Sequence, residues 1–420
     1  MLNSENTPES VHSGPGPKLS TFQANEGHLG HSEDRPQTVP DKIGTGPKLS
    51  RTVSGPAPNC PGQFCPQPET PNQRTNQVWV RDVPIGGGAP CAVQSMLNLP
   101  LSQVDENLAQ IQRVADAGCD IIRIAIPHAS DLEFFQEICA RSPLPVVADI
   151  HFSANLAIEA AKRGAAKLRI NPGNIGGLEA TIPVLEAAKQ AGIPIRIGVN
   201  AGSLDAALRD DPTLTLPQKL ARSARQYVEF CEQQGFTDLV VSAKAHDVPT
   251  TVETYRIISR ELPRIPLHIG VTEAGTLFQG LIKSASGLGI LLEEGIGDTI
   301  RISLTDDPVE EVKAAWVLLG SLGLRLRYPE LISCPTCGRC QVDLISLAKQ
   351  VEDRLASVPH PIRVAVMGCV VNGPGEAKDA DIGVACGDGQ GVIFAGGEVI
   401  KKVPEARIVD ELMAHIATLD

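Results

Sequence analysis

The 420-residue sequence has few aromatic residues, 3% of the total, and no excess of basic ones, because its formal net charge is −12. The core must therefore be built from aliphatic side chains, which suits a parallel α/β sheet. The acidic balance argues against nucleic-acid binding. No apolar run reaches the roughly 18 residues of a membrane span, and the N-terminus lacks the basic and then apolar pattern of a secretory signal. We therefore expect neither a membrane protein nor a secreted one.

The cysteines do not suggest a disulfide framework, since the 11 of them are an odd number spread over a long chain. A reducing compartment, the cytoplasm, is the expected location. Residues 1–76 are rich in Pro, Gly, Ser and Asn and show almost no apolar periodicity, so we predict a disordered tail. Cys60 and Cys65 lie in this tail with no further ligand nearby, and we assign them no metal.

From Val78 onward, short β-like runs alternate with helical stretches. Eight such runs occur, at residues 91–96, 121–126, 145–150, 167–170, 194–199, 239–243, 266–271 and 299–304. Eight units of even length favour a closed (β/α)8 TIM barrel over a doubly wound open sheet. Ser102-x-x-Asp105 predicts a capping box before one helix, and Asp307-Pro308 predicts the start of another. We predict a barrel domain over residues 77–326 and a smaller α/β domain over residues 327–420.

Every predicted strand ends in polar residues, and the carboxyl ends of barrel strands form the active-site face. These residues are Gln94, Ser95, Arg123, Asp149, His151, Arg169, Asn171, Arg196, Asn200, Ser242, Lys244, Glu273, Arg301 and Ser303. Four arginines and a lysine meet only two acids in this set, so the surplus of positive charge predicts an anionic ligand. Guanidinium groups match phosphate oxygens, which favours a phosphate or diphosphate. The glycine-rich PGNIGG after Arg169 offers backbone N–H groups to the same anion.

Two of these side chains are candidates for acid–base chemistry. His151 follows a strand in the sequence DIH, beside the arginines, although a structural hydrogen-bonding role is the alternative. Glu273 in VTEAG faces the same cationic rim and is a candidate proton donor to a bound anionic substrate.

The C-terminal region carries two cysteine motifs, CPTCGRC at Cys334–Cys340 and GCVVNGPGEA at Gly368–Ala377. Thiolates on turns rich in Gly and Pro suit an iron–sulfur cluster, because such turns offer backbone N–H groups to the cluster sulfurs. The favoured ligands are Cys334, Cys337, Cys369 and Glu376. Zinc is the alternative, held by Cys334, Cys337, Cys340 and Cys369, and Cys386 is a further possible ligand.

Eight motifs together resemble the 4-hydroxy-3-methylbut-2-enyl diphosphate synthase family, from Val78 to about Asp420. They are AVQSM, ADIHF, LRINPGN, IRIGVNAGSL, TEAG, EGIGDTIRISL, SCPTCGR and GCVVNGPGEA. The resemblance is to the two-domain bacterial form, and it implies an iron–sulfur oxidoreductase of isoprenoid biosynthesis. Its reaction is the two-electron ring opening and dehydroxylation of 2-C-methyl-D-erythritol 2,4-cyclodiphosphate.

The resemblance also implies a role for each matched residue. A [4Fe–4S] cluster is held by Cys334, Cys337 and Cys369, with Glu376 as a replaceable ligand of the fourth iron. The diphosphate is bound by Arg123, Arg169, Arg196, Lys244, Arg301 and Ser303. Asn200 and the catalytic candidates surround the carbon skeleton, with Glu273 the proton donor beside Asp149 and His151. A homodimer is implied, in which one subunit's cluster domain caps the other's barrel, with a flavodoxin or ferredoxin as electron donor.

Some residues depart from the family pattern. Leu97 and Leu99 replace hydroxyl residues that the family commonly has after the first strand, and Cys340 is an extra thiol. If Cys340 ligated iron, the exchangeable site would be lost and the protein would be an electron carrier with a four-cysteine cluster. A transferase barrel like the pterin synthases, with a structural zinc domain, is a third hypothesis.

Overall fold

The computed structural model describes residues 74–369 and 380–419. The predicted disordered tail, with Cys60 and Cys65, falls outside these residues except for its last three positions, and so does Glu376. Thr75 and Asn76 already bond to the barrel: the Thr75 hydroxyl donates to Asp298 and the Asn76 N–H to the carbonyl of Arg264.

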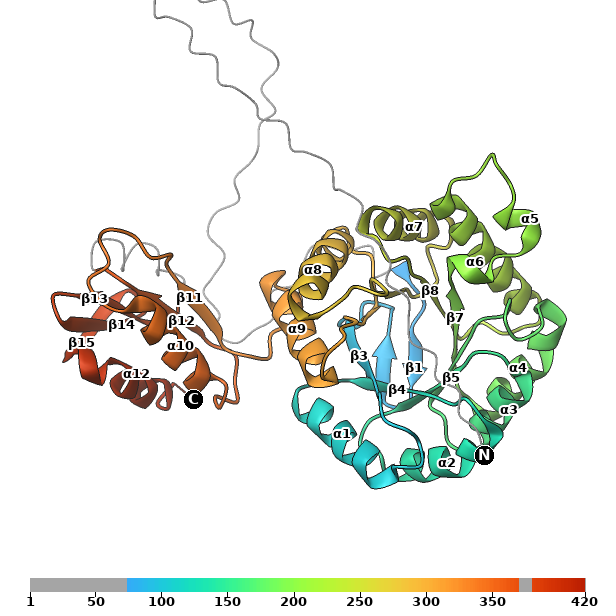
Figure 1. Cartoon of the computed structure of the whole chain (residues 1–420), viewed down its shortest axis with the longest axis horizontal. Helices are drawn as coiled ribbons and strands as arrows, with labels where there is room; N and C mark the ends of the chain where they lie inside the picture. Colours follow the sequence, from blue (N-terminus) through green and yellow to red (C-terminus); the bar gives the residue numbers. More distant parts are fainter. Residues whose placement is uncertain (1–73, 370–379, 420) are drawn as a thin grey trace, which may run out of the picture. The chain divides into compact units, whose positions relative to one another are not determined.

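Eight parallel strands form the barrel (Figure 1). They are β3 (Ala92–Met96), β4 (Ile121–Ala125), β5 (Val146–Ile150), β6 (Lys167–Ile170), β7 (Ile195–Val199), β8 (Leu239–Ala243), β9 (His268–Ile269) and β10 (Thr299–Ile300). Strands β3 to β8 pair in chain order, β10 lies between β3 and β9, and a bridge between Val241 and Leu267 joins β8 to the residue before β9. The prediction of a TIM barrel is confirmed, and each of the eight predicted runs contains a strand.

Helices surround the strands. They are α1 (Val104–Asp116), α2 (Leu132–Arg141), α3 (Ala154–Lys162), α4 (Leu178–Ala191), α6 (Leu216–Gln233), α7 (Val248–Glu261), α8 (Leu277–Glu293) and α9 (Pro308–Ser321), with the short α5 (Ala206–Arg209) before α6. The predicted start of α9 is confirmed, because the Asp307 carboxylate accepts the N–H of Val309 at 2.9 Å. The predicted capping box at Ser102 is wrong. There the Asn107 side chain donates to the carbonyls of Pro100 and Gln103 instead.

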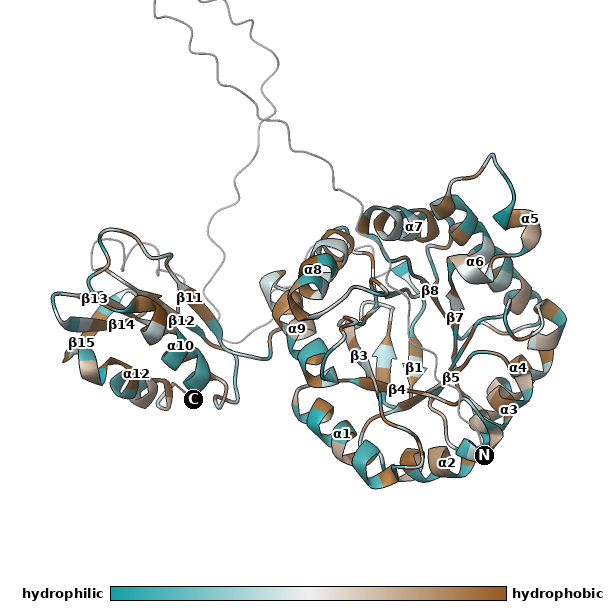
Figure 2. Ribbon diagram, viewed as in Figure 1, coloured by the Kyte–Doolittle hydropathy of each residue, from teal (hydrophilic) through white to brown (hydrophobic). Residues whose placement is uncertain are grey.

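The barrel core lies between the strands and the helices, and the inside of the barrel is polar. In β6, Leu168 and Ile170 belong to the apolar core between sheet and helices. Alternation along the strand then turns Lys167 and Arg169 to the inside. Hydrophilic colour is concentrated on the outer faces of helices such as α1 (Figure 2). This alternation supplies the polar side chains from which the site is built.

A hairpin that the sequence did not reveal closes the amino end of the barrel. Its strands are β1 (Val78–Val80) and β2 (Val83–Ile85), which pair antiparallel. Their buried side chains pack with one apolar residue from each of four barrel strands, Ala92, Ile121, Val147 and Val240. Three-residue strands are too short to show a periodicity, so this apolar floor could not be predicted from the pattern.

Asp298 is buried at the same end of the barrel and makes stability depend on pH. Its carboxylate accepts the N–H of Leu267 at 2.7 Å and the hydroxyl of Thr75 at 3.0 Å. Burial raises the pKa of Asp298 to about 7, although both hydrogen bonds act to lower it. The folded-state pKa therefore lies above the unfolded value, so protonation favours the folded state and stability falls as pH rises from about 4 to 7.

We expect Asp298→Asn to remove this pH dependence. The loss in the wild type is about 4 kcal/mol between pH 4 and pH 7, and a neutral amide of the same shape avoids it. Urea unfolding at a series of pH values measures the effect, with exposed Asp238→Asn as control. A variant whose stability falls with pH as steeply as that of the wild type would contradict the assignment.

The C-terminal domain is a five-stranded sheet covered by two helices. The strands lie in chain order, β11 (Glu330–Ser333), β12 (Arg363–Met367), β13 (Ile382–Gly387), β14 (Gln390–Ala395) and β15 (Glu398–Pro404), the first three parallel and the last two antiparallel. Helices α10 (Leu344–Leu355) and α12 (Ile408–Ile416) pack on one face through Val351 and Leu412. The smaller α/β domain is thus confirmed. Across the residues described, no helix is both long and apolar enough to cross a membrane.

Candidate active site

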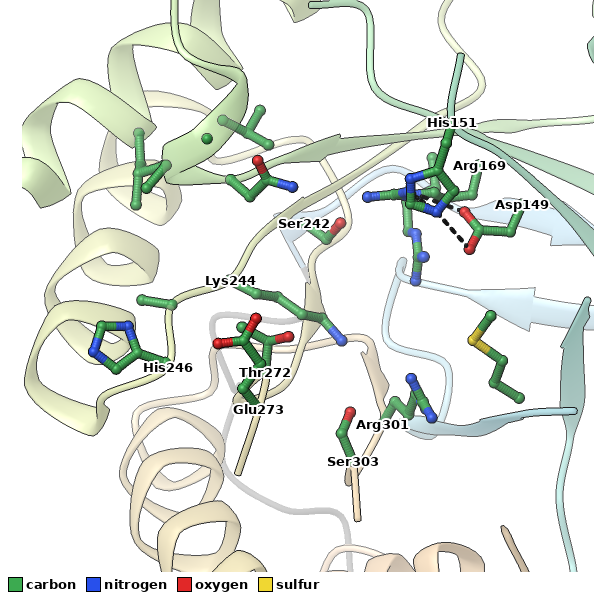
Figure 3. A pocket seen from close by; sticks show the side chains of 18 of the residues that line it. Asp149, His151, Arg169, Ser242, Lys244, His246, Thr272, Glu273, Arg301 and Ser303 are labelled. Atoms are coloured by element: carbon green, nitrogen blue, oxygen red, sulfur yellow. Dashed lines mark hydrogen bonds and ion pairs between the residues drawn. The ribbon is translucent and has the colours of Figure 1, made fainter. Parts of the chain in front are cut away.

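A cavity of about 560 Å³ opens at the carboxyl ends of the barrel strands (Figure 3). The structure brings together there all ten barrel residues that the sequence analysis assigned to a site: Arg123, Asp149, His151, Arg169, Arg196, Asn200, Lys244, Glu273, Arg301 and Ser303. They come from segments up to 180 positions apart in the chain, so their convergence is a property of the closed barrel. Their individual roles stay predictions.

Asp149 is the centre of a charged network in this cavity. Its carboxylate accepts hydrogen bonds from Arg169 at 3.0 Å and pairs with His151 Nε2 at 3.2 Å, and Arg123 Nε lies 3.6 Å away. Figure 3 shows the first two contacts as dashed lines. The Asp149 side chain is only 2% exposed, so its charge acts at close range with little screening by water. One carboxylate therefore orients three basic groups.

The titration of this network follows from its charges. Burial alone would raise the pKa of Asp149, but the charge of Arg123, the His151 hydrogen bond and the charge of Arg169 outweigh it and hold the pKa well below its usual range. Burial lowers the pKa of Arg123 to about 10, against the opposing effect of Asp149. At neutral pH, Asp149 is thus a carboxylate and Arg123 a cation.

Gly198 leaves the space that Arg169 occupies. It lies in β7 next to β6, and a β-carbon at this position would be 2.7 Å from Arg169 Nε and 2.8 Å from Nη2. Such a contact is far too short for any side chain to tolerate, so the guanidinium would have to leave. Glycine is therefore required at position 198 because it leaves room for the Arg169 guanidinium, and not because the backbone turns there.

We expect Gly198→Ala to displace Arg169 from Asp149 and to weaken the binding of inorganic pyrophosphate by about tenfold or more, the value of one charge-assisted hydrogen bond. Titration calorimetry measures the affinity. Gly289→Ala in α8 is a matched control, because the nearest atom to its new β-carbon is 4.0 Å away. Unchanged affinity in Gly198→Ala would show that Arg169 does not hold the anion.

Arg301 has an acidic partner that sequence reasoning missed. Glu311, on α9, is buried, and its carboxylate accepts hydrogen bonds from Arg301 Nη2 at 3.0 Å and from the Ser95 hydroxyl at 2.9 Å. The same carboxylate accepts the N–H of Leu304 at 3.0 Å. The expectation that the rim supplies only two acids is therefore wrong. No pattern at the strand ends could have revealed Glu311, because it reaches the site from the following helix.

A surplus of positive charge remains after this correction. Arg196 is 1% exposed, and neither its Nε nor its Nη1 has a hydrogen-bond partner within the described part of the chain. Burial, and then the charges of Arg196 and Arg123, lower the pKa of Lys244 well below its usual range. Buried donors without acceptors are costly. The cavity is thus suited to a ligand that is anionic and rich in acceptor oxygens.

Glu273 has an unusual backbone conformation. Its φ is +53°, in the left-handed region that non-glycine residues seldom adopt. The neighbouring Thr272 donates its N–H to the carbonyl of Ala245 at 3.1 Å, and this bond helps to hold the segment. Conformations of this kind cost about 1–3 kcal/mol and are concentrated at functional sites. The strain is consistent with a carboxyl group kept at the cavity for its chemistry.

Ser242, which was predicted at a strand end, and His246 and Thr272, which were not predicted, also line the cavity. The proximity of His246 to Lys244 and of Thr272 to Glu273 in the sequence was the available signal. Gln94, Ser95 and Asn171, also predicted at strand ends, are buried and do not line the cavity. Leu97 is buried in the barrel core and Leu99 is exposed, and neither lines the cavity. The two departures from the family pattern therefore do not alter the cavity wall.

Two of the predicted cluster ligands, Cys334 and Cys369, follow neighbouring strands of the C-terminal sheet. Cys334 follows β11 and Cys369 follows β12, and the Cys334 sulfur accepts the N–H of Gly368 at 3.3 Å. Hydrogen bonds from the backbone and side chain of Arg339 lower the pKa of Cys337. The lowered pKa favours a thiolate at Cys337, and an N–H group directed at the Cys334 sulfur is the kind of contact that cluster ligands make. These two residues therefore fit an iron–sulfur cluster. Among residues 74–369 and 380–419, no three His, Cys, Asp or Glu side chains lie close enough together to hold a metal ion.

Cys340 makes contacts of a different kind. Its thiol donates to the carbonyl of Val342 at 3.3 Å, and its sulfur lies against Gly368, where a β-carbon would be only 2.6 Å from it. Cys386 is fully buried, which raises the pKa of its thiol to about 12. The described residues therefore hold Cys340 by a hydrogen bond to the backbone and Cys386 by burial.

Comparison with known proteins identifies the family. The model of the GcpE TIM-barrel domain matches residues 75–316, and that of the GcpE protein C-terminal domain matches residues 330–418. The chain belongs to the GcpE family. The resemblance noted in the sequence is thereby confirmed.

Curated GcpE relatives match most of the chain. The Geobacter sulfurreducens protein is 49% identical over 82% of this chain and 97% of its own length. The Aquifex aeolicus protein is 48% identical over 83% of this chain and 97% of its own length. The Bifidobacterium longum protein is 51% identical over 82% of this chain and 86% of its own length. Each is named 4-hydroxy-3-methylbut-2-en-1-yl diphosphate synthase (flavodoxin). A dihydropteroate synthase structure from Yersinia pestis covers 60% of this chain at 17% identity and a TM-score of 0.46, a likeness too weak for any argument.

Proposed function

We propose that this protein reduces 2-C-methyl-D-erythritol 2,4-cyclodiphosphate to 4-hydroxy-3-methylbut-2-enyl diphosphate in isoprenoid biosynthesis. Two electrons and a proton are taken up, the ring C–O bond to the diphosphate breaks, and a hydroxyl group leaves as water. The curated relatives carry the name of this enzyme. The observation that carries the proposal is the cavity itself, in which five basic side chains converge on a space with unpartnered donors.

The basic residues bind the diphosphate. Arginine forks make paired hydrogen bonds to phosphate oxygens, and the low exposure of these side chains strengthens each contact. Asp149 and Glu311 hold the guanidinium groups in place before the substrate arrives, which reduces the ordering that binding requires. The residues assigned to the diphosphate are Arg123, Arg169, Arg196, Lys244, Arg301 and Ser303.

Glu273 is the proposed proton donor for the departing hydroxyl group. It lines the same cavity as the diphosphate-binding residues and can approach the carbon skeleton of a bound substrate. Asn200 and His151 contact the hydroxyl groups of that skeleton. Asp149 acts with His151 by fixing the orientation of its ring through the 3.2 Å contact.

A [4Fe–4S] cluster is the proposed cofactor, and when bound it supplies electrons one at a time. Cys334, Cys337 and Cys369 would hold three irons, and Glu376 would be the replaceable ligand of the fourth. The hydrogen bonds to Cys334 and Cys337 support thiolate ligands at these positions. We propose that the barrel domain, residues 77–326, binds the substrate and that residues 327–420 carry the cluster.

The electron donor is proposed from the names of the relatives, and the subunit arrangement from the resemblance in sequence. Their names specify flavodoxin, which we propose as the electron donor, with ferredoxin the alternative. A cytoplasmic homodimer is proposed, in which the cluster domain of one subunit caps the barrel of the other. A lid of this kind would exclude water from the cavity during reduction.

Identification of the product tests the proposed function. Anaerobic protein with a reconstituted cluster is incubated with the cyclodiphosphate and reduced viologen, and phosphorus NMR follows the reaction. We expect the cyclic diphosphate resonances to be replaced by those of an open-chain allylic diphosphate, and Arg196→Met to abolish the change. Arg260→Met, at an exposed position that does not line the cavity, should behave as the wild type. An unchanged spectrum with cluster-loaded protein would refute the proposal.

A further inference from the structure

A second layer of basic side chains lies beneath the cavity, sealed from solvent. Lys167 is two positions before Arg169 on β6 and pairs in register with Val147, whose side chain belongs to the apolar floor. Its side chain is 0% exposed, and it does not line the cavity. Within residues 74–369 and 380–419, Lys167 Nζ has no hydrogen-bond partner. Neither proposed catalysis nor the apolar core uses this amine.

The charges around Lys167 leave its ammonium form without a counter-ion. Three basic groups act on it electrostatically: Arg123 on β4, Arg196 on β7 and His268 on β9. Arg169 and Lys244 add to the positive charge around Arg196 and Arg123. None of the acids described in the barrel pairs with it. Asp149 is paired with Arg123, Arg169 and His151, and Glu311 with Arg301, while Glu273 lines the cavity. Asp298, at the amino end, accepts hydrogen bonds from Leu267 and Thr75.

An unpaired ammonium in such a place is strongly disfavoured. Burial, and then the charges of Arg196 and Arg123, lower the pKa of Lys167 well below its usual range. An anion bound to Arg196 and Arg123 would cancel the two charges that repel a proton on Lys167. The interior has a low dielectric constant, so this effect reaches a neighbouring layer without direct contact.

We infer that Lys167 is an uncharged amine in the free protein and takes up a proton when the anionic substrate enters the cavity above it. Substrate binding and proton binding then reinforce each other, since a coupling between two sites acts equally in both directions. Lys167 thus influences substrate binding through its charge, without touching the substrate. The identity of the anion rests on the proposed function, but the coupling does not.

Lys244 and His268 are the other candidates for this proton. Lys244 lines the cavity, and its pKa is lowered by the same causes as that of Lys167, but it would contact the anion directly. His268 is as sealed as Lys167, with neither ring nitrogen hydrogen-bonded to any described residue. Burial, and then Arg196, Lys244, Lys167 and Arg123, lower its pKa well below its usual range. Variants at these two positions separate the candidates.

Calorimetry in buffers of different ionisation enthalpy counts the protons taken up on binding. Two cyclic anions serve as probes, the cyclodiphosphate and trimetaphosphate. Each phosphorus in them carries one strongly acidic group, so neither probe titrates near neutral pH. We expect the wild type to take up about one proton at pH 8, and its affinity to fall by up to about tenfold per pH unit as pH rises. Lys167→Met should take up none and show a flat profile, whereas His268→Gln should keep the uptake. Lys244→Met removes one contact to the anion, so it should bind both probes more weakly but still take up a proton.

Stability supplies an independent readout of the free protein. Replacing a sealed, unpaired amine by an apolar chain of similar length should raise the urea midpoint of Lys167→Met above that of the wild type. Exposed Lys189→Met should leave the midpoint unchanged. If Lys167→Met does not fold, Lys167→Arg provides the test, because a permanent charge allows binding without uptake.

Two results would overturn the inference: no proton uptake by the wild type, or an uptake lost in Lys244→Met or His268→Gln and kept in Lys167→Met. The probes separate this failure from that of the proposed function. Binding of trimetaphosphate with proton uptake, but none of the cyclodiphosphate, would uphold the coupling and reject the substrate.

Discussion

Replacing Glu273 by Gln is expected to lower the turnover of the cyclodiphosphate by about 10²–10⁴-fold and to change its affinity little. The amide keeps the size of the carboxyl group and the same left-handed backbone, at φ +53°, but cannot supply the proton that the leaving hydroxyl needs. The loss should therefore appear in kcat rather than in KM. Steady-state oxidation of reduced viologen gives kcat, and calorimetry gives the affinity.

Glu293→Gln is the matched control for this variant. Glu293 is exposed at the end of α8 and does not line the cavity, so its kinetics should equal those of the wild type. If Glu273→Gln kept full turnover, another group would have to donate the proton. A loss confined to affinity would make Glu273 a binding residue only.

Replacing Asp149 by Asn is expected to destabilise the protein by about 3–5 kcal/mol, as when one partner of a buried ion pair is removed. The substitution leaves Arg123, Arg169 and His151 around a neutral amide. Because the pKa of Asp149 is held well below its usual range, its contribution is present above the unfolded pKa of about 3.9 and is lost as pH falls below that value. The difference between wild type and variant in urea unfolding should therefore be full at pH 7 and shrink in acid.

Asp82→Asn provides the control for a charge pair of the same kind. Asp82 forms an ion pair with Arg81 at 2.9 Å, but its side chain is 74% exposed, and surface pairs contribute little. The two variants thus compare one substitution in buried and exposed settings. An Asp149→Asn protein as stable as Asp82→Asn at pH 7 would contradict the central place of Asp149 in the network.

Residues close in sequence to the strand ends were predictable, because the barrel fixes where those ends meet. The sequence places a polar side chain such as Arg169 or Asp149 just where a short aliphatic run stops, and parallel strands carry such positions to one face. Glu311 and Lys167 escaped this reasoning for different reasons. Glu311 lies on a helix and reaches Arg301 only through a tertiary contact. Lys167 is the first residue of its strand, and nothing in the local sequence indicates that this lysine is buried.

Local signals at element ends were less reliable. Asp307 caps α9 as its position before Pro308 indicates. At α1, the helix begins one residue later than predicted, after Gln103, and no side chain caps its N–H groups. Asn107 donates to the carbonyls of Pro100 and Gln103, which are different backbone groups from those that a Ser cap would satisfy. The ligand set of the cluster also stays a prediction, because its fourth member, Glu376, lies outside the described residues.

The most direct test of the account is anaerobic oxidation of reduced viologen by protein that carries a full four-iron cluster. The rate is compared with and without the cyclodiphosphate. The account predicts rapid bleaching that depends on the cyclodiphosphate and saturates with it. Bleaching that is absent, or that proceeds equally without the cyclodiphosphate, would contradict a reductase and indicate an electron carrier, with Cys340 as the fourth ligand of the cluster.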